Sequence, residues 1–506
     1  RYRIGAVCIL LGACAISCAE VFGEPIDAQV DCGALHQTMR GFGTCFFMHD
    51  VVAYRNPKFY DDLVYDLGVS AMRYPLPWEF KPAGDDEALP EERLGLGPHE
   101  RRMAFLKEFQ ARGVPLFFTS LWSPPAWMKT NRHVEHGGHL RPDMRGEFAE
   151  FLATSVRVCS ERFGLEFSAV SLQNELRFVE PYGSCVYGGG SLRETVRAVM
   201  RRFGRDGVKT RIMIPEELAR QAHRVRAYIA PVMADPETRD FPGHFCVHSG
   251  GSAKAWRALH NALADHKREM WMTETPAGGR NWPTALHSAR RIHDALAGGN
   301  VSLWTFWQPG FHDGRNRGLA YYPIKHFYRF VRPGAVRVEA RPWDGDVVVS
   351  AFHHEEDGNL TIIAINSSKK ARTVALHVDG MEPESYRVYR SSETEKCTRL
   401  GDMAATSPLR VELPAQSIVT LQSGPELVIP RHEGVNSVPA IAKLGTGKDE
   451  LLHAAARRNR LEDVQRLLSE GFDADAQGVS GWTPLHRAAF PGHARLALPL
   501  VTAGAD

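Results

Sequence analysis

The sequence predicts a multidomain protein in which a (β/α)8 TIM barrel is followed by a β-sandwich side domain and then by an α-helical repeat segment. Three observations predict this fold class. Strand-like and helix-like segments alternate through the first two thirds of the chain, short alternating runs follow, and a repeat occupies the last part. A chain of 506 residues is also too long for one small core, so two or three domains are expected.

The first 19 residues have the pattern of an export signal. A charged start precedes an apolar run over residues 4–16, which is too short to span a bilayer, and small residues before and at Ala19 suit a signal peptidase. The segment Leu11-Gly12-Ala13-Cys14 also matches a bacterial lipobox, which would make Cys14 a lipid-modified anchor. We therefore expect an exported protein that is secreted, periplasmic or lipid-anchored at the cell surface. A buried N-terminal helix is the alternative.

The predicted barrel covers residues 30–333. Eight strands are expected, at residues 43–47, 70–74, 116–120, 168–172, 211–214, 245–248, 270–273 and 302–306. Amphipathic helices are expected between them, for example at residues 100–110, 147–162, 192–203 and 285–297. An open doubly wound sheet is the alternative fold, but the glycine-rich phosphate turn typical of it is missing from the sequence.

Past Pro333-Gly334 the pattern changes to short alternating runs separated by turn residues. Six strands are expected, at residues 336–339, 347–352, 360–365, 373–378, 386–389 and 418–421. No helix-length segment intervenes, so the sequence predicts a β-sandwich over residues 334–424. Residues 425–447, which contain prolines and glycines, read as a linker.

Residues 448–506 contain an internal repeat. Leu452-His453-Ala454-Ala455 returns 33 residues later as Leu485-His486-Arg487-Ala488, and Thr483-Pro484-Leu485-His486 is the ankyrin signature. About three such repeats are needed to stack a stable core, and about two are present, so we expect a truncated array. An ankyrin array offers a concave surface, which makes a protein partner the expectation for this segment.

The composition excludes several classes of function. The chain has 61 basic and 59 acidic residues, a balance that gives no reason to expect a nucleic-acid partner. The nine cysteines form no Cys-x-x-Cys pair, so neither a zinc site nor a redox motif is indicated. After export, one or two disulfides and free buried thiols both remain open.

Two glutamates, Glu175 and Glu274, stand at or just past the ends of apolar runs that are predicted as the fourth and seventh strands. Groups at the carboxyl ends of barrel strands meet at one mouth, so residues distant in sequence can converge there. Two carboxyl groups about 5 to 5.5 Å apart can hydrolyse a β-glycosidic bond with retention. We therefore predict Glu175 as acid/base and Glu274 as nucleophile, with no metal or organic cofactor. A surface glutamate in a strand-to-helix loop is the alternative for Glu175.

Further candidates stand at predicted strand ends: Arg73, Trp122, Asn174, Glu216, Glu217, His248 and Trp307. An arginine beside a carboxyl group favours its ionised form, which a nucleophile needs. Tryptophan faces suit the CH-rich sides of sugars, although core packing is the alternative for each tryptophan. Trp127 is assigned to the scaffold. Either Glu216 or Glu217 is the fallback nucleophile.

Several motifs together resemble glycoside hydrolase family 30, the glucosylceramidase-like group. The motifs are Leu121-Trp122-Ser123-Pro124-Pro125-Ala126-Trp127-Met128-Lys129, Ser171-Leu172-Gln173-Asn174-Glu175, Trp271-Met272-Thr273-Glu274, Phe330-Val331-Arg332-Pro333-Gly334 and Pro414-Ala415-Gln416-Ser417. The resemblance covers about residues 30–423. It implies a retaining β-glycosidase whose β-sandwich packs rigidly on the barrel and includes the strand before Gly41.

The resemblance also implies roles for individual residues. Arg73 would sit beside the nucleophile Glu274, Asn174 would bind the 2-hydroxyl of the sugar, and Trp122 and Trp307 would line the bottom of the cleft. The family acts on a range of β-linked glycans and glycosides, so the resemblance leaves the sugar open. Basic residues in predicted loops, namely Lys129, Arg132, Arg177, Arg280 and Arg315, would form a rim that favours an acidic polysaccharide, with solvated surface charge as the alternative.

The sequence departs from the family pattern at two places. Leu176 follows Glu175 where the family usually has proline, and Gly250 stands two residues after His248 where the family often has a tyrosine that bonds the nucleophile. These departures keep a second hypothesis open, in which an inactive barrel binds glycans or serves as a scaffold and the ankyrin segment carries the function.

Overall fold

The computed structural model describes residues 24–45, 56–77, 79–82, 91–94, 97–308, 311–313, 316–432, 448–457, 459–476, 483–489 and 492–505. The predicted leader, residues 433–447 of the predicted linker and Arg315 lie outside the described residues. Residues 425–432 of that linker are described, and their end lies against the barrel, where the backbone N–H of His432 donates to the Tyr65 hydroxyl at 3.4 Å.

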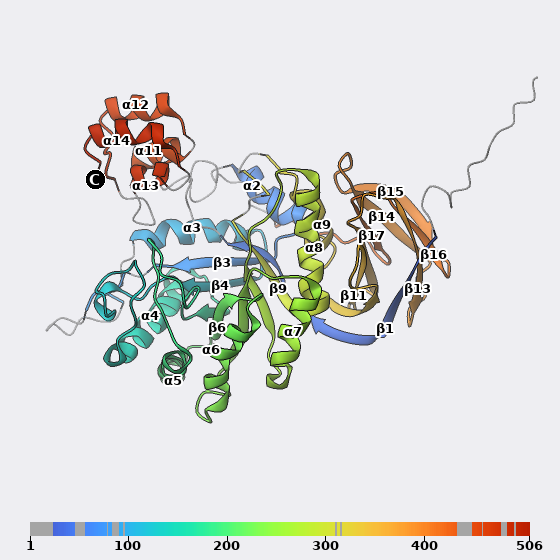
Figure 1. The fold of residues 1–506 in the computed structure, drawn as a ribbon, viewed down its shortest axis with the longest axis horizontal. Helices are drawn as coiled ribbons and strands as arrows, with labels where there is room; N and C mark the ends of the chain where they lie inside the picture. The colour runs from blue at the N-terminus through green and yellow to red at the C-terminus, as the bar shows by residue number, and fades with distance from the viewer. Residues whose placement is uncertain are drawn as a thin grey trace, which may run out of the picture.

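Parallel strands close into a barrel, as the fold-class prediction requires (Figure 1). In the described part of the chain the barrel order is β2(Gly41–Cys45), β3(Ala71–Leu76), β4(Leu116–Leu121), β5(Ala169–Ser171), β6(Arg211–Leu218), β7(Gly243–His248), β8(Met270–Glu274) and β9(Val301–Trp307), and β9 pairs with β2 to close it. Each predicted strand overlaps one of these, and the prediction of a TIM barrel is confirmed.

Helices follow most of the barrel strands and form its outer layer (Figure 1). Their bounds are α2(Pro57–Asp61), α3(Gly97–Ala111), α4(Arg145–Phe163), α5(Gly189–Asp206), α6(Ala222–Ala234), α7(Ala253–Leu263), α8(Trp282–Gly299) and α9(Tyr321–Tyr328), with a π-helical turn at Asp62–Leu67 after α2. Apolar residues recur along one face of α5 and of α7, so burying that face stabilises helix and barrel together.

The interior of the barrel has an apolar layer and, above it, a polar layer. Successive residues of a strand point to opposite faces, so residues two apart point the same way. The apolar layer holds Ala71, Phe118, Ala169, Met213, Cys246, Trp271 and Leu303. Two residues further along three of these strands stand Arg73, Ser120 and His248, which are also buried. The same alternation that fills the core therefore carries polar groups to the carboxyl end of the barrel.

The side domain is one curled sheet of nine strands, in the order β15(Thr398–Ala404), β14(Ser385–Ser391), β17(Ser417–Gln422), β12(Asn359–Asn366), β11(Val347–His354), β10(Val336–Arg341), β1(Ile26–Thr38), β13(Arg372–Asp379) and β16(Leu409–Leu413). Strand β1 precedes the barrel in sequence but lies between β10 and β13. The six predicted strands are present. Strands β15 and β16 are additional to the prediction: β15 is almost wholly exposed and lacks an apolar face, whereas β16 alternates buried and exposed residues and was missed despite that pattern.

One face of the curled sheet packs on the barrel. Val348, Phe352, Ile363, Ile365 and Ile418 belong to the same buried cluster as the barrel helices. The opposite face has a core of its own, so every residue of β12 is buried. Polar links cross the junction: His326 of α9 bonds Thr420 Oγ1 at 2.7 Å, and the indole N–H of Trp282, at the start of α8, donates to the Gln416 carbonyl at 2.6 Å.

The C-terminal segment forms helices α11(Lys448–Arg457), α12(Leu461–Ser469), α13(Pro484–Ala489) and α14(Ala497–Thr502). Leu452, Val464, Leu467, Leu496 and Leu500 share its buried cluster. The signature residues Thr483 and His486 bond through Thr483 Oγ1 and His486 Nδ1 at 2.8 Å, at the start of α13. The helical repeat segment of the fold prediction is confirmed.

Two further findings concern the membrane and the thiols. Within the described residues, no helix combines the length and the apolar character that crossing a bilayer requires. The six cysteines from Cys32 to Cys397 are free thiols, and all but Cys397 are buried.

The junction between sheet and barrel predicts a measurable stability difference. Ile363→Ala removes a side chain that is 1% exposed and lies between the two cores, so the free energy of unfolding should fall by about 2 to 5 kcal/mol. Leu400→Ala is the control, because Leu400 is 45% exposed on β15 and should change the free energy by about 0.5 kcal/mol or less. Urea unfolding followed by tryptophan fluorescence measures both, and equal effects would contradict the packing of this face on the barrel.

Candidate active site

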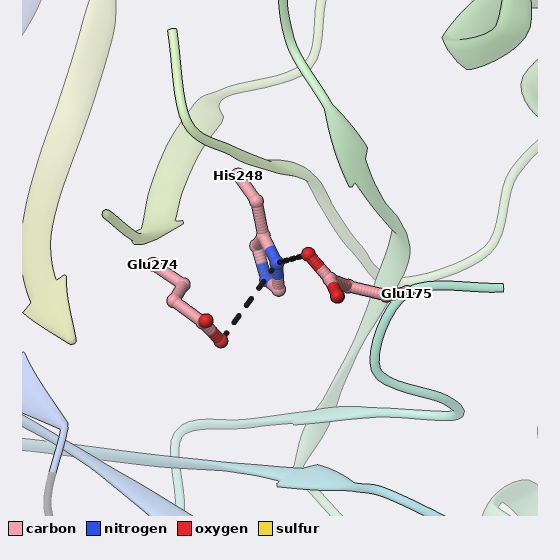
Figure 2. Close-up of side chains that lie close together, drawn as sticks. All are labelled: Glu175, His248 and Glu274. Carbon is pink, nitrogen blue, oxygen red and sulfur yellow. Dashed lines mark hydrogen bonds and ion pairs between the residues drawn. The ribbon is translucent and has the colours of Figure 1, made fainter. Parts of the chain in front are cut away.

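Glu175 and Glu274 converge at the carboxyl end of the barrel with His248 between them (Figure 2). A carboxylate oxygen of each glutamate and a ring nitrogen of His248 all lie within 4.8 Å of one another. His248 Nδ1 is 3.2 Å from Glu175 Oε1 and 3.8 Å from Glu274 Oε2. Both glutamate side chains are 19% exposed, whereas His248 is 1% exposed, so the carboxylates face the opening and the imidazole lies beneath them.

Irregular strand pairing places these side chains. The register of β7 and β8 shifts after Val247 pairs with Met272, so that His248 stands opposite Glu274. The register of β6 and β7 also shifts, between Pro215 and Glu217. A bulge of this kind leaves one residue unpaired and redirects a side chain, and bulges are frequent beside active sites. Glu216 is the residue skipped in the second shift.

Arg73, on β3, is fully buried and joins four side chains. Its guanidinium donates to Glu274 Oε2 at 2.6 Å and to Asn174 Oδ1 at 2.8 Å. It also donates to both carboxylate oxygens of Glu216 at 3.1 Å and to Ser120 Oγ at 3.0 Å. Its guanidinium carbon lies 4.7 Å from the centre of the Trp122 ring. The structure thus brings Arg73 beside Glu274, as the resemblance implied.

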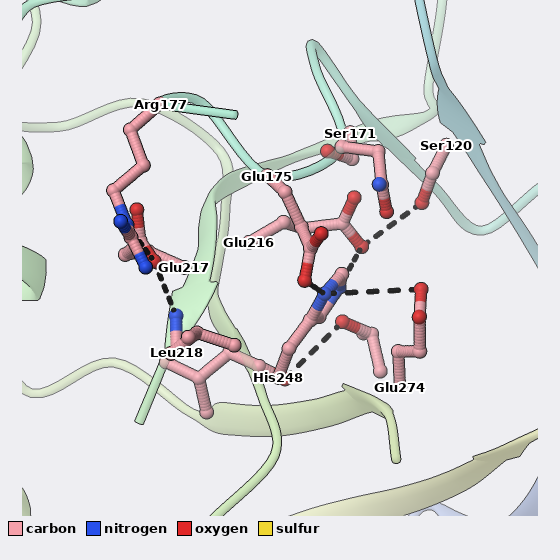
Figure 3. Close-up of polar contacts among 12 residues, drawn as sticks. Ser120, Ser171, Glu175, Arg177, Glu216, Glu217, Leu218, His248 and Glu274 are labelled. Atoms are coloured by element: carbon pink, nitrogen blue, oxygen red, sulfur yellow. Dashed lines mark hydrogen bonds and ion pairs between the residues drawn. The ribbon is translucent and has the colours of Figure 1, made fainter. Parts of the chain in front are cut away.

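The two adjacent glutamates of β6 point to different surroundings (Figure 3). Glu216 is fully buried and accepts from Arg73 and from Ser120 Oγ, the latter at 2.9 Å. Glu217 is also fully buried, and its Oε1 accepts from Arg177 Nε at 3.2 Å and from the Leu218 backbone N–H at 2.8 Å. Because both carboxylates are enclosed and paired, neither is placed to attack a substrate as the fallback nucleophile.

The charged groups of this site determine the protonation states of its buried residues Glu216, His248 and Arg73. Burial raises the pKa of Glu216, but Arg73 and His248 outweigh burial and bring it down to about 2. Burial lowers the pKa of His248, but Glu274, Glu175 and Glu216 outweigh burial and raise it to about 10. Burial also disfavours the charged form of Arg73, yet Glu216 and the other nearby anions keep its pKa above the usual value. Near neutral pH the buried layer therefore holds a carboxylate, a guanidinium and an imidazolium.

The two predicted cleft tryptophans lie side by side, with ring centres 5.9 Å apart. Trp122 is 4% exposed and packs against Arg73, whereas Trp307, at the end of β9, is half-buried. Trp127 donates its indole N–H to the Phe80 carbonyl at 2.8 Å, in agreement with its assignment to the scaffold.

The predicted basic rim is wrong for Lys129. That side chain is buried, and its ammonium donates to Ser123 Oγ and to the carbonyls of Val134 and Ser184 at 2.6 to 3.0 Å. Burial lowers its pKa to about 8. Arg177 is half-buried and pairs with Glu217, and Arg132 and Arg280 are exposed.

The two departures from the family pattern have local explanations. A Cβ at Gly250 would overlap the buried Trp256 indole, so the position excludes a tyrosine unless Trp256 moves. Leu176 is 1% exposed and belongs to the barrel core, where an apolar side chain of its size is accommodated.

A cation would meet opposition at this site. The spacing of Glu175, His248 and Glu274 is short enough for one ion to touch all three. However, Arg73 already binds Glu274 Oε2, and Glu274, Glu175 and Glu216 hold His248 in its cationic form. Two fixed positive charges beside the opening disfavour a third, so these residues do not suit a metal centre.

Sequence reasoning missed three polar residues near the site. Ser120 bonds Glu216, and Ser171 contributes to the lowered pKa of that carboxyl group. Burial, Glu180, Glu175 and Glu274 raise the pKa of Tyr182 well above its usual value, so its phenol stays protonated near both carboxylates. Side chains alternate between the inside and the outside of the barrel along β4 and β5, and this pattern could have identified the two serines as inward-pointing residues. Tyr182 lies in an irregular loop and gave no such signal.

Comparisons with known proteins agree with this geometry. A glucuronoxylanase of Bacillus subtilis is 23% identical over 453 residues, which cover 82% of this chain and 97% of that protein. The crystal structure of a glycoside hydrolase family 30 subfamily 8 xylanase from Clostridium acetobutylicum has a TM-score of 0.69 and 23% identity, covering 79% of this chain and all of that chain. The chain is a glycoside hydrolase with the family 30 fold. These two relatives of the hydrolase are xylanases, and neither is a glucosylceramidase.

The C-terminal part of this glycoside hydrolase matches the family model of ankyrin repeats over residues 452–498. Ankyrin repeat domain-containing protein 49 of Bos taurus is 43% identical over 65 residues, which cover 13% of this chain and 27% of that protein. The resemblance to family 30 fused to ankyrin repeats is therefore confirmed.

The raised pKa of His248 predicts a pH-dependent contribution to stability. A raised pKa means that the bound proton stabilises the fold, so this contribution is complete below about pH 6.5 and is lost as the pH rises to about 10. The stability advantage of wild type over His248→Gln should therefore shrink by roughly 1 kcal/mol per pH unit in that window. Urea unfolding at several pH values measures it.

His326→Gln is the matched control. Burial lowers the pKa of His326 to about 3, so His326 is neutral in the folded and unfolded chain above about pH 7. The difference in the free energy of unfolding between wild type and His326→Gln should be constant from about pH 7 to about pH 10. A constant difference for His248→Gln as well would contradict a buried imidazolium.

Proposed function

We propose that this glycoside hydrolase is a retaining β-glycosidase that cleaves β-linked xylan by a two-glutamate double displacement. The observation that carries the proposal is the approach of Glu175 and Glu274 to within 4.8 Å at the carboxyl end of the barrel. Retaining enzymes keep their carboxyl groups about 5 to 5.5 Å apart, whereas inverting enzymes need about 6.5 to 9.5 Å to admit a water molecule. The short approach supports direct attack by one of the two carboxylates.

In the first step, Glu274 attacks the anomeric carbon and the glycosidic oxygen leaves with a proton from Glu175. Arg73 and His248 both face Glu274 Oε2, so Oε1 is the oxygen that attacks. The hydrogen bond from Arg73 also fixes the orientation of the Glu274 carboxylate. In the second step, Glu175 takes a proton from water, the water oxygen attacks the anomeric carbon, and Glu274 leaves as a carboxylate.

The remaining predicted residues bind the sugar in this proposal. Asn174 is held by Arg73 through its oxygen, so its amide nitrogen donates to the 2-hydroxyl. Trp307, half-buried beside Trp122, supplies an aromatic face to the sugar ring. With Glu175 protonated as the acid, the carboxylates of Glu216 and Glu274 balance Arg73 and His248, and the attacking oxygen of Glu274 stabilises the positive charge that develops on the sugar in the transition state. Xylan is proposed because the glucuronoxylanase and the xylanase cover most of the chain.

The test is loss of activity with trapping of the nucleophile. Glu274→Gln should lower kcat/KM on glucuronoxylan and on an aryl β-xyloside by about a thousandfold or more, because the covalent step is lost. A 2-fluoro β-xyloside should label Glu274 in the wild type, as mass spectrometry of peptides would show. Glu166→Gln, an exposed carboxylate before β5, is the control and should keep wild-type activity. Labelling of another carboxylate, or of none, would overturn the assignment and favour the non-catalytic alternative.

We propose that the ankyrin segment binds a protein partner and thereby places the hydrolase near its substrate. Leu498 and Val501, on α14, are 75% and 53% exposed, which supports an apolar contact surface on this helix. The buried cluster of the ankyrin segment is separate from the clusters of the barrel and the sheet, which supports a role of this segment that is independent of catalysis.

We also propose export through the N-terminal segment, on the strength of its charged start, apolar run and small residues. Expression in a bacterial host should yield protein outside the cytoplasm that begins after Ala19, or a lipid-modified form that begins at Cys14. Intact mass and N-terminal sequencing distinguish the two forms. Unprocessed protein confined to the cytoplasm would contradict both.

A further inference from the structure

Glu216 is a buried carboxylate that the proposed reaction does not use. It is fully buried within the barrel mouth, below the two partly exposed glutamates. Arg73 donates to both of its oxygens at 3.1 Å, Ser120 donates to Oε1 at 2.9 Å, and Nε2 of His248 lies 3.6 Å from Oε1. A buried carboxylate is costly unless cations and donors surround it, and each of these neighbours meets that need.

The backbone reinforces the unusual placement of this side chain. Glu216 has a positive φ of 51°, and it is the residue skipped where the register of β6 and β7 shifts. Glu175 has a positive φ of 49°. Glutamate rarely adopts this left-handed conformation, and such outliers cluster at functional sites. The two carboxylates that flank His248 are therefore both held by strained backbone.

His248 faces an acceptor on each side. Nδ1 is 3.2 Å from Glu175 Oε1, and Nε2 is 3.6 Å from Glu216 Oε1 (Figure 3). An imidazolium presents an N–H to each carboxylate, within hydrogen-bond distance of Glu175 and in ion-pair contact with Glu216, whereas a neutral imidazole would turn a lone pair toward one of them. The arrangement of acceptors thus selects the doubly protonated ring.

Groups from several strands bear on the charge of His248. The anions are Glu175 from the loop after β5, Glu216 from β6 and Glu274 from β8, and the cation is Arg73 from β3. The thiols of Cys45 on β2 and Cys246 on β7 stay protonated, because burial raises their pKa values. Three carboxylates against one other cation favour the imidazolium.

We propose that Glu216 is a positioning residue for hydrolysis: its buried charge keeps His248 as an imidazolium, and the Nδ1–H of that ring orients the carboxyl group of Glu175 toward the leaving oxygen. This inference rests on the proposed function. It assigns Glu216 no contact with substrate, and it explains why a third carboxylate is enclosed behind the pair that reacts. Without the charge of Glu216, His248 loses one of its three anionic partners and can release the proton that orients Glu175.

The first test measures the protonation of His248 directly. In protein labelled with ¹⁵N-histidine, the His248 signal is assigned by its loss in His248→Gln and is then titrated by NMR. Wild type should titrate well above pH 6.5, and Glu216→Gln should lower the midpoint by about one pH unit or more, since an opposite charge at this range shifts a pKa by about 1 to 3 units. Glu216→Asp keeps the charge and should restore most of the shift.

Glu217→Gln is the matched control. It removes the same charge from the adjacent, equally buried position, but its partner is Arg177 rather than His248. Its His248 midpoint should stay within a few tenths of a unit of wild type. A wild-type midpoint near 6.5 would overturn the proposal without any variant, and so would equal shifts in Glu216→Gln and Glu217→Gln.

The second test separates positioning of the acid from general damage. The dinitrophenolate of a 2,4-dinitrophenyl β-xyloside leaves without a proton from an acid. The leaving group of a phenyl or alkyl β-xyloside needs the proton from Glu175. Glu216→Gln should therefore lower kcat/KM about tenfold or more for the poor leaving group and about threefold or less for the dinitrophenyl substrate. Equal losses would overturn the positioning role. If the wild type hydrolyses neither substrate, the proposed function fails, and the NMR titration still reports whether Glu216 controls His248.

Discussion

The buried pairing of Arg73 with Glu216 is the interaction on which the rest of the mouth depends. Neither side chain is exposed, and an isolated charge at that depth would cost several kcal/mol, so each requires the other. Once paired, Arg73 still has donors for Glu274 and Asn174, and Glu216 still has an oxygen facing His248. The pair thus links side chains from six barrel strands or the loops that follow them.

This network explains the irregular backbone around the site. Met213 points into the barrel, so regular alternation along β6 would turn Glu217 inward and Glu216 outward, the opposite of what the network requires. The register shifts on either side of β7 resolve that conflict. The positive φ values of Glu175 and Glu216 are a local cost that the surrounding hydrogen bonds offset.

The side domain supports β8 and β9, the strands that end in the proposed nucleophile Glu274 and in Trp307. Helices α8 and α9 follow β8 and β9, and both are fixed to the curled sheet by buried polar contacts. His293 of α8 bonds Ser350 Oγ at 2.7 Å, and His326 of α9 bonds Thr420 and Ser391. Buried, satisfied polar contacts of this kind permit one arrangement and penalise others. The sheet is therefore part of the support of the site, while the ankyrin helices have a separate core.

The sequence alone determined the order of the elements, because strands, helices and repeats each have a local periodicity. It also predicted that Glu175 and Glu274 lie at the same end of the barrel, because both follow barrel strands. It missed β15, whose residues have no apolar face, and it left Glu216 as a competing nucleophile and Lys129 as a rim residue. Only the tertiary structure decided that Glu216 is buried and paired, that Lys129 is buried and hydrogen-bonded, and that Trp256 fills the space beside Gly250. These outcomes depend on strand register and on desolvation by distant segments, and no local pattern of residues encodes either.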